Sequence, residues 1–572
     1  MNNENNNNKE NKDIKNSQTI KFFSLGGLGE IGKNMYVIEV DERIFIFDAG
    51  SKIPGDDLLG VDFVYPNISY LEENASKVVG LFLTHAHDEN IGATIEILKR
   101  FNVGIFASHF TISILEDKIK EAGLEIKDYR LYRINEEKIL KFGDTQIEAY
   151  YVSHSIPETL NFAICTRSGI IVYAPDFTFN ISNDRKYVIN FDKITDLGKR
   201  GVLALACGSM GVNNTGTHSN VFLENNVTQL AMKNKRIIIS MYSTDLDKLQ
   251  RVINVCLKFN RRIALIGRKT QKLISKAIEI GYIDVPSERL VNLRFRDINN
   301  IENDEADLAI IVLGKSHEPY HSIERMCKGN DRLVKIGRGD EVLFIAPPQL
   351  GCERIASRAV DSIIMCGAKY YSLSEEELRS EYADREEMKM LYNMLKPKYL
   401  IPICGEFRHQ YVQKQMASQS FFNERNIFVV ENGEVLTFVD GEFKGLTDHI
   451  TCGDVLVDGA IVGDVNDMVL KDRELMSEDG IIIASILISK NKKRIIDGPK
   501  FEFCGVIRDS NDVFLNELPE LTNEFFKSYF KLKDEEKTAS CNEMLRDCLM
   551  KKMFTDTLKR PLIIPSVVEI EE

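Results

Sequence analysis

The stretch "LTHAHDEN", from Leu83 to Asn90, decides how the rest of the chain is interpreted. His85 and His87 are one residue apart at the end of the apolar run "VVGLFL". A strand that ends in His-x-His presents two imidazoles to the same side, and imidazole is a common ligand of zinc. The stretch therefore predicts a metal site. Glu89 and Asn90, the next side chains within reach, leave open whether that site is complete.

Length and composition indicate a globular protein of several domains. The chain has 572 residues, 44% of them hydrophobic and 28% charged, which predicts three or four domains. No apolar run approaches the roughly 18 residues that cross a bilayer, and no signal peptide opens the chain, so we expect no membrane association. Eleven cysteines without a CxxC pair favour the reducing cytoplasm. The net charge of −13 still permits a local basic channel for nucleic acid.

The N-terminal region combines a polar tail with a strand–turn–strand unit. Residues 1–19 are low in complexity and rich in Asn, which predicts a disordered tail. Alternating and β-branched residues predict strands at Met35–Val40 and Ile44–Phe47. Gly27, Gly29 and Gly32 fit the spacing G-x-G-x-x-G, but no amphipathic helix follows them. A tight turn is therefore favoured over a phosphate cradle.

Further along the chain the pattern changes from short strands to repeating helix–strand units. A helix is expected over Ile91–Phe101 and short strands from there to about Thr178. Beyond Gly201, helix–strand repeats predict a parallel sheet. A charged helix is expected at about Ser374–Leu395, and "GDVLVDGAIVGDV" predicts β structure before a mixed α/β tail.

Three more residues at expected strand ends complete a candidate metal constellation. His154 follows a strand in "AYYVSHSIPE", and Asp176 follows another in "GIIVYAPDF". Asp48, at the end of "IFIFDAG", is placed to orient a ligand. A lone histidine at a strand end is usually an ordinary polar residue. The whole set in this order is much more specific for a hydrolytic metal site.

This order of motifs resembles the metallo-β-lactamase fold and, more closely, ribonuclease J of the β-CASP branch. The segments "SLGGLGEIGKNMYVIE", "GRKTQKLISKAIEIGYI" and "LKPKYLIPICGEFRH" are similar to successive parts of that family, and "GDVLVDGAIVGDVNDMVLKDRELMSEDGIIIASILIS" is the most specific. The resemblance implies an α/β fold: an αββα sandwich with an inserted β-CASP domain and a small C-terminal α/β domain. The expected divisions are a tail (1–19), the sandwich (20–205 and 368–447), the β-CASP domain (206–367) and a β linker with the C-terminal domain (448–572).

The resemblance also implies a chemistry and a set of site residues. Members of the family use two metal ions, commonly zinc or manganese, to hydrolyse RNA as 5′–3′ exonucleases and as endonucleases. By position, His85, His87 and His154 are the expected ligands of the first ion. Asp176 is the expected bridging and catalytic carboxylate, and Asp48 the residue that supports the ligands.

The second half of the family's metal site departs from the pattern H-x-H-x-D-H. Glu89 and Asn90 stand where the family has Asp and His, and Cys404 in "IPICGE" replaces a further histidine. Glu89 keeps a carboxylate that can still act as catalyst or ligand, but its oxygen is displaced by one bond. Asn90 is a poor zinc ligand, whereas Cys404 can bind zinc with a different reach. We expect one Zn2+ or Mn2+ ion in preference to two, or none.

The inserted domain departs from the family as well. Gly208 in "CGSMG" stands where an acidic residue is expected, and the phosphate-holding S-G-H-A loop reads "SEYA", with Ser380 kept and Tyr382 in place of histidine. Glu381 adds negative charge beside the expected phosphate. Ser380, Tyr382, Arg268 and Lys269 remain candidate RNA contacts. Basic residues of the same region that are candidates for a backbone-tracking groove are Lys233, Lys235, Arg236, Lys258, Arg261, Arg262 and Lys272.

Three functions compete. The favoured hypothesis is a weakly active or non-catalytic, RNA-binding member of RNA processing and decay. It would associate with itself or with an active ribonuclease J paralogue through the C-terminal domain. The alternative is an active exo- and endoribonuclease with an altered metal centre. A hydrolase of small molecules is disfavoured by the insert and the C-terminal domain.

Overall fold

The computed structural model describes residues 17–55, 58–180, 185–214, 219–267, 270–293, 305–349, 351–378, 380–459, 461–463, 467–506, 513–532 and 539–571. Two compact units divide the chain. The first comprises residues 1–52 and 65–454, and the second comprises residues 53–64 and 455–572. The candidate site residues named above all belong to the first unit.

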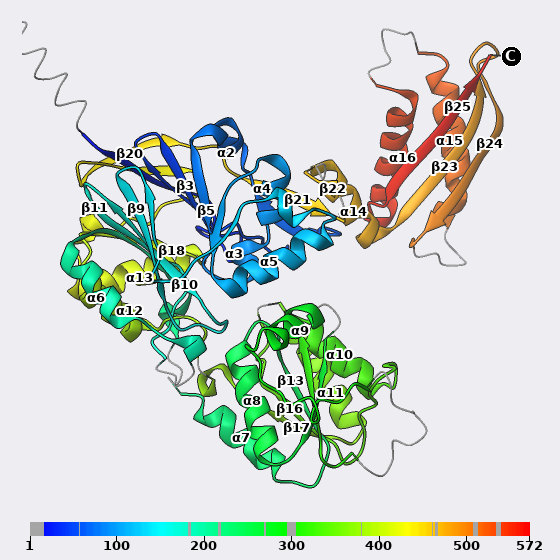
Figure 1. Ribbon diagram of the computed structural model, residues 1–572. Coiled ribbons are helices and arrows are strands. Elements are labelled where there is room, and N and C mark those ends of the chain that lie inside the picture. The colour runs from blue at the N-terminus through cyan, green and yellow to red at the C-terminus, as the bar shows by residue number, and fades with distance from the viewer. Residues whose placement is uncertain are drawn as a thin grey trace, which may run out of the picture. The chain divides into compact units, whose positions relative to one another are not determined.

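Two β-sheets packed face to face form the larger part of the first unit (Figure 1). The first sheet has the order β20-β19-β1-β2-β3-β5-β6-β7 and the second the order β18-β12-β11-β10-β9-β8. The strands of the first sheet are β1 Thr19–Gly26, β2 Met35–Val40, β3 Arg43–Phe47, β5 Val78–Phe82, β6 Ile105–Ala107, β7 Leu131–Arg133, β19 Glu434–Val439 and β20 Glu442–His449. Those of the second are β8 Ile139–Phe142, β9 Thr145–Tyr151, β10 Leu160–Thr166, β11 Gly169–Ala174, β12 Val202–Gly208 and β18 Tyr399–Ile403.

Aromatic side chains fill the space between these sheets. Phe47, Phe82, Phe162 and Tyr173 are completely buried there, and the rings of Phe47 and Phe82 stack at 5.4 Å between centroids. Each such side chain contributes roughly 1.5–3 kcal/mol by burial. Because β3, β5 and β11 are anchored by these rings, the loops that follow the three strands are held at the same edge of the sandwich.

Helices cover the outer faces of the sandwich (Figure 1). The helices associated with the first sheet are α2 Ser69–Glu73, α3 Asp88–Ile91, α4 Thr94–Arg100 and α5 His109–Glu121. Those associated with the second are α6 Phe191–Arg200, α12 Arg385–Leu395 and α13 Phe407–Ser420. This is the layered arrangement that the family resemblance implies.

A five-stranded parallel sheet, ordered β14-β15-β13-β16-β17, forms the inserted domain. Its strands are β13 Ile237–Tyr242, β14 Arg262–Ile266, β15 Leu308–Gly314, β16 Glu341–Phe344 and β17 Lys369–Ser372, and its helices are α7 Val221–Ala231, α8 Leu246–Lys258, α9 Gln271–Glu279, α10 Glu318–Cys327 and α11 Glu353–Met365. Ile239 packs with the core that contains α7, α8 and α9, and its neighbour Ile238 packs with α10 and α11. The sheet is thus buried on both faces, as near-continuous apolar strands require.

The described residues of the second unit form two small sheets and three helices. One sheet has the order β22-β21-β4 and the other β24-β23-β25. Their elements are β4 Phe63–Pro66, β21 Asp454–Asp458, β22 Ile461–Val462, β23 Ile481–Ser489, β24 Arg494–Cys504 and β25 Leu562–Ile570, with helices α14 Asp467–Asp479, α15 Val513–Tyr529 and α16 Cys541–Thr557. Ile482, Leu518, Leu549 and Ile563 are among the residues of its core.

Several sequence expectations need correction. His109–Glu121 is a helix, although short strands were expected there, because Ser108 caps its N-terminus and the apolar residues recur at helical spacing. The expected charged helix begins only at Arg385, after its cap Asp384. The N-terminal tail was drawn too long, since Thr19 begins β1. The insert was drawn too short, since β17 pairs with β16.

Other expectations are confirmed. Met35–Val40 is a strand, and Arg43–Phe47 extends the second predicted strand by one residue. Gly27, Gly29 and Gly32 all have positive φ in a turn that leads directly into β2, so no helix provides a phosphate cradle there. Within the described ranges, none of the helices combines the length and the apolar character needed to cross a membrane.

Candidate metal centre

Three histidines meet at one edge of the sandwich. His85 and His87 follow β5 and precede α3, and His154 follows β9. All three side chains are buried, and their ligand nitrogens lie within 4.8 Å of one another. In the part of the chain that the structure describes, this is the one group of three potential metal ligands.

Each histidine donates through one ring nitrogen to a fixed acceptor. His87 Nε2 lies 3.1 Å from the carbonyl oxygen of Thr244, and His154 Nδ1 lies 2.8 Å from that of Glu381. A carbonyl oxygen only accepts, so these nitrogens carry the protons. His85 Nδ1 is 2.9 Å from Thr84 Oγ1, whose own hydrogen is directed to a carboxylate at 3.0 Å. The partners therefore fix the tautomer of all three rings.

The other three nitrogens are left as bare lone pairs that face one another. His85 Nε2 and His87 Nδ1 are 3.0 Å apart, and His154 Nε2 is buried without a hydrogen-bond partner. Two lone pairs at this distance repel unless a cation lies between them. Zinc–nitrogen bonds of about 2.0–2.1 Å in tetrahedral geometry place ligand nitrogens about 3.3 Å apart, so the triad fits such an ion.

Burial favours the neutral form of two of these imidazoles, those of His85 and His154. It lowers the pKa of His85 well below 6.5, with further lowering by His87 and His154. It lowers the pKa of His154 in the same way. A neutral imidazole is the form that binds a metal ion. The lowered pKa values and the tautomers therefore both favour metal binding.

Asp48 supports the triad from behind. Its side chain is completely buried and accepts from Thr84 N at 2.8 Å, Tyr173 OH at 2.8 Å and Asn90 Nδ2 at 2.9 Å. Burial raises the pKa of Asp48 to about 6, while these hydrogen bonds oppose the rise. Asp48 thus holds Thr84, which in turn holds His85.

Two further carboxyl groups lie at the centre. Asp176, two residues after β11, is buried, and its pKa is raised well above 3.8 by burial and by the neighbouring carboxylates Glu89 and Asp48. Glu89 Oε1 lies 3.7 Å from His87 Nδ1 on a side chain that is 37% exposed. A buried carboxyl group whose pKa is raised by neighbouring carboxylates makes the centre attractive to a cation.

The residues at the expected second-ion positions have other partners. The amide of Asn90 donates to Asp48, and also to Thr84 Oγ1 at 3.3 Å. The thiol of Cys404 lies 3.5 Å from Tyr36 OH, and Tyr36 also receives the backbone N–H of Cys404 at 3.0 Å. Burial and Asp176 raise the pKa of the Cys404 thiol well above 9, so it is protonated at neutral pH. Neither group is in the form that a metal ion binds.

The side chain of Ser380 forms hydrogen bonds within the loop Ser380–Tyr382 and to Asn214. Ser380 Oγ donates to the Tyr382 carbonyl at 2.8 Å and accepts from Tyr382 N at 3.0 Å and Asn214 Nδ2 at 2.5 Å. The ring of Tyr382 lies 6.2 Å from that of His154. Burial, followed by the nearby carboxylates of Glu89 and Asp176, raises the pKa of the Tyr382 phenol. Tyr382 therefore lies beside the triad.

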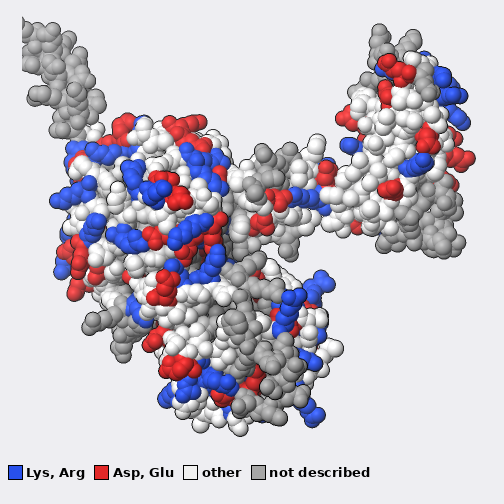
Figure 2. All heavy atoms as spheres, turned by 45° about the vertical axis from the view of Figure 1, so that its right-hand side comes forward, with Lys and Arg blue, Asp and Glu red and all other residues white. Residues whose placement is uncertain are grey.

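Most of the predicted basic groove is used in structural contacts. Arg261 is buried and donates to main-chain carbonyls that include Ala231 O and Lys235 O, and Arg236 pairs with Asp340. Lys233, Lys235, Arg262 and Lys272 also have carboxylate partners. In Figure 2, basic and acidic residues alternate over the face that is shown. Arg268 and Lys269 lie outside the described residues.

Asp88 makes ion pairs that the sequence analysis did not predict. Its carboxylate pairs with Lys118 of α5 at 2.9 Å and with Lys315, which follows β15 in the inserted domain. The two lysines lower the pKa of Asp88 despite its burial. Together with the bond from His87 to Thr244, this pair links the histidine loop to the insert.

Family models match most of the chain. The metallo-β-lactamase superfamily matches residues 28–221 and the ribonuclease J β-CASP domain residues 234–363. The Zn-dependent metallo-hydrolase RNA specificity domain matches residues 380–430, and the ribonuclease J C-terminal domain matches residues 468–570.

Whole-chain relatives decide the assignment. The chain is 33% identical to Ribonuclease J 2 of Staphylococcus saprophyticus, over 97% of this chain and 99% of the relative. It is 32% identical to Ribonuclease J 2 of Staphylococcus aureus over similar shares. The chain belongs to the ribonuclease J family. The predicted fold, a metallo-β-lactamase sandwich with an inserted β-CASP domain and a C-terminal domain, is thereby confirmed.

Membership of the ribonuclease J family makes this a protein of RNA processing, and the matched metallo-hydrolase domains imply a metal ion. A crystal structure of a protein of unknown function from Enterococcus faecalis V583 has a similar fold, with a TM-score of 0.52 and 14% identity. It covers 73% of this chain and all of that one.

Sequence reasoning missed the main-chain acceptors of the centre. Thr244 and Glu381 contribute only carbonyl oxygens, from positions 157 and 227 residues away from their histidines. Since every residue type carries a carbonyl group, no side-chain signal marks them.

Proposed function

We propose that this ribonuclease J family member is an RNA-binding subunit with at most one metal ion and a low or absent hydrolytic rate. It assembles with an active ribonuclease J chain through its C-terminal domain. The observation that carries the proposal is the hydrogen bond from Asn90 to Asp48. This bond engages the side-chain amide at the expected second-ion position with Asp48.

His85, His87 and His154 are the residues that would hold the ion, with Asp176 as the nearby carboxylate. A bound divalent ion would supply Lewis-acid polarisation of a phosphodiester and of water. Around it, Thr84, Thr244 and Glu381 O keep the imidazoles oriented. A single ion lacks the two-ion clamp on the attacking and leaving oxygens, which supports a low rate.

An active enzyme with an altered centre is the second candidate. Glu89 favours it, because its carboxylate lies beside His87 and can accept a proton from water in place of the family's aspartate. The longer side chain of Glu89 moves its oxygens, and a displacement of about 1 Å can cost about 100-fold in rate.

The decisive experiment measures ion content and RNA degradation on the same preparation. We expect about one Zn2+ or Mn2+ per chain and little loss of a 5′-monophosphorylated RNA. The His85→Ala/His87→Ala protein, purified identically, controls for contaminating nucleases. Processive degradation by the unmutated protein that is absent from the control would favour the active enzyme and overturn the proposal.

The C-terminal unit supports the assembly part of the proposal. Ile563 of β25 faces the helix-covered core, whereas Ile564 and Val568 are 41% and 53% exposed on the other face of the strand. Ile496 of β24 is also exposed. Exposed apolar residues on one face of a small sheet fit a second chain of the same family. We expect Ile564→Lys/Val568→Lys to abolish co-purification with an active ribonuclease J chain, whereas Lys490→Glu in the same unit leaves it intact.

A further inference from the structure

The inserted domain contacts the histidine loops through the start of helix α8. The helix begins at Leu246, after its cap Asp245. The carbonyl oxygen of Thr244, one residue before the cap, lies 3.1 Å from His87 Nε2 and accepts its proton. His87 thereby presents Nδ1 to the other histidines. The conformation of the chain at Thr244 therefore decides how firmly the His87 ring is held.

The same helix start holds the loop of His154. The backbone N–H groups of Leu246 and Asp247 donate to the carbonyl oxygen of Ser155 at 2.9 and 3.2 Å. The first N–H groups of a helix have no partner within the helix, so this carbonyl satisfies two of them. Ser155 directly follows His154 in the chain. Two of the three histidines thus lie in segments that are hydrogen-bonded to one turn of the inserted domain.

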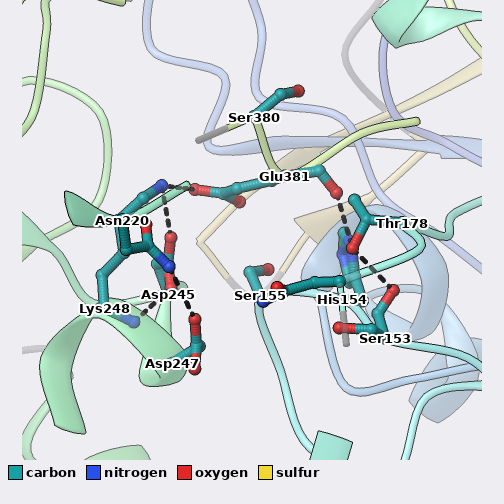
Figure 3. A pocket seen from close by; sticks show the side chains of 11 residues that line it. Ser153, His154, Ser155, Thr178, Asn220, Asp245, Asp247, Lys248, Ser380 and Glu381 are labelled. Carbon is teal, nitrogen blue, oxygen red and sulfur yellow. Dashed lines mark hydrogen bonds and ion pairs between the residues drawn. The ribbon is translucent and has the colours of Figure 1, made fainter. Parts of the chain in front are cut away.

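A second connection from α8 reaches His154 through Glu381. The carbonyl oxygen of Glu381 lies 2.8 Å from His154 Nδ1, and its carboxylate lies 3.8 Å from Lys248 Nζ. Figure 3 shows Glu381 between these two partners. Lys248 pairs more closely with Asp245, at 2.6 Å. The charged contacts at the helix start therefore continue to the residue that fixes the tautomer of His154.

Asp245 holds the first turn of α8 in shape. Its side chain is buried and accepts from the backbone N–H of Lys248 at 2.8 Å, in addition to pairing with the ammonium group of that lysine. An aspartate or asparagine oxygen at this position stabilises the start of a helix, whereas alanine offers no such acceptor. The effect of Asp245 on the histidines passes through the backbone of Thr244 and Leu246.

We propose that Asp245 is a positioning residue for the metal centre, and that the capped start of α8 is needed for tight binding of an ion by the histidine triad. Without the cap, the backbone at Thr244 and Leu246 is no longer held against the two histidine loops. Loss of a partner that supports a ligand costs about 10–100-fold in metal affinity. By thermodynamic linkage, an ion at the triad stabilises the start of α8 in return. The inference rests on the part of the proposed function that places one ion at the triad.

The zinc affinity of the full-length protein, measured by competition with a chromophoric chelator, tests the role of Asp245. We expect Asp245→Ala to bind zinc at least about tenfold more weakly than the unmutated protein. Asp245→Asn keeps an oxygen for the cap and should stay within about threefold of the unmutated protein. Asn190→Ala is the matched control, because Asn190 caps α6 by the same kind of bond, to Lys193 N at 2.9 Å, and should leave the zinc affinity unchanged.

Two results of this titration would overturn the inference alone. One is an unchanged zinc affinity of Asp245→Ala. The other is an equal loss in Asp245→Ala and Asp245→Asn, because the charge of Asp245 and not the cap would then be responsible.

Hydrogen exchange of the unmutated protein tests the linkage without relying on the folding of a variant. We expect zinc to slow exchange of the backbone N–H groups of residues 246–248 at least about threefold relative to the chelator-treated protein. Helix α11, which packs on the other face of the inserted sheet, is the internal control and should not change. Unchanged exchange at the start of α8 in protein that binds zinc would overturn the inference alone. Protein that binds no zinc would overturn it together with the expectation of one ion per chain.

Discussion

The side-chain amide of Asn90 donates to Asp48 Oδ2 at 2.9 Å, in the completely buried space behind the histidine triad. This bond gives Asn90 a structural role at a position where the ribonuclease J pattern leads us to expect a metal ligand. It also stabilises the charged form of Asp48, whose pKa burial raises to about 6. The residue that replaces an expected ligand of the second ion thus supports the side chains that hold the histidine triad.

We predict that Asn90→Ala lowers the free energy of unfolding of the chelator-treated protein by about 1.5–3 kcal/mol near pH 7.5, the usual worth of a hydrogen bond to a charged group. Because the pKa of Asp48 is raised from 3.8 to about 6, ionisation of Asp48 costs stability as the pH rises through that window. Asn90 offsets part of this cost only when Asp48 is ionised. The loss should therefore be full above about pH 6 and smaller near pH 5.

Urea denaturation at both pH values measures this difference. Asn393→Ala is the matched control, since Asn393 donates to Lys389 O on an exposed helix surface and has no carboxylate partner there. A loss from Asn90→Ala that is the same near pH 5 and near pH 7.5 would contradict the proposed coupling to Asp48.

The sequence predicted the parts of this centre that depend on side-chain identity and strand order. His85, His87 and His154 each follow a strand, and buried strands are readily recognised from their apolar runs. The hydrogen-bond partners of these histidines could not be predicted. The carbonyl of Thr244 comes from the inserted domain, and only the folded chain brings it to His87.

Arg261 shows why basic residues that are clustered in the sequence do not line a groove in the structure. Composition alone cannot distinguish a solvent-exposed arginine from one that satisfies buried carbonyls, because both occur in charged, helix-rich segments. In the structure, Arg261 is 3% exposed and donates to the carbonyl oxygens at the end of α7. The guanidinium group of Arg261 therefore binds main-chain carbonyl groups inside the inserted domain.

We predict that Arg261→Met lowers the free energy of unfolding by at least about 3 kcal/mol, because several buried carbonyls lose their donor together. RNA affinity per folded molecule should change by less than about twofold. Lys258→Met, an exposed position on α8, is the control and should leave stability within about 0.5 kcal/mol. A large loss of RNA affinity from Arg261→Met at unchanged stability would instead place Arg261 in an RNA-binding surface.

Cys404 provides a spectroscopic prediction. Its thiol is protonated, since burial and Asp176 raise its pKa, and Tyr36 holds it by hydrogen bonds. When Co2+ replaces the native ion, we expect no thiolate-to-cobalt charge-transfer band. The visible bands should require His154 and be lost in His154→Ala. An intense charge-transfer band that disappears in Cys404→Ser would show that Cys404 is a ligand and that a second ion site exists.

The last prediction restores the family pattern. Glu89→Asp/Asn90→His/Cys404→His should bind two ions per chain, measured by elemental analysis, and should degrade 5′-monophosphorylated RNA at least about 100-fold faster than the unmutated protein. The N–H of the new imidazole at position 90 can donate to Asp48 in place of the amide, so the support of His85 is kept. Adding His154→Ala to the triple variant is the control and should remove the gain. If the unmutated protein itself degrades this RNA processively, a triple variant that binds two ions but is no faster would mean that the altered centre is already competent. The Glu89 carboxylate beside His87 would then be the residue to test next.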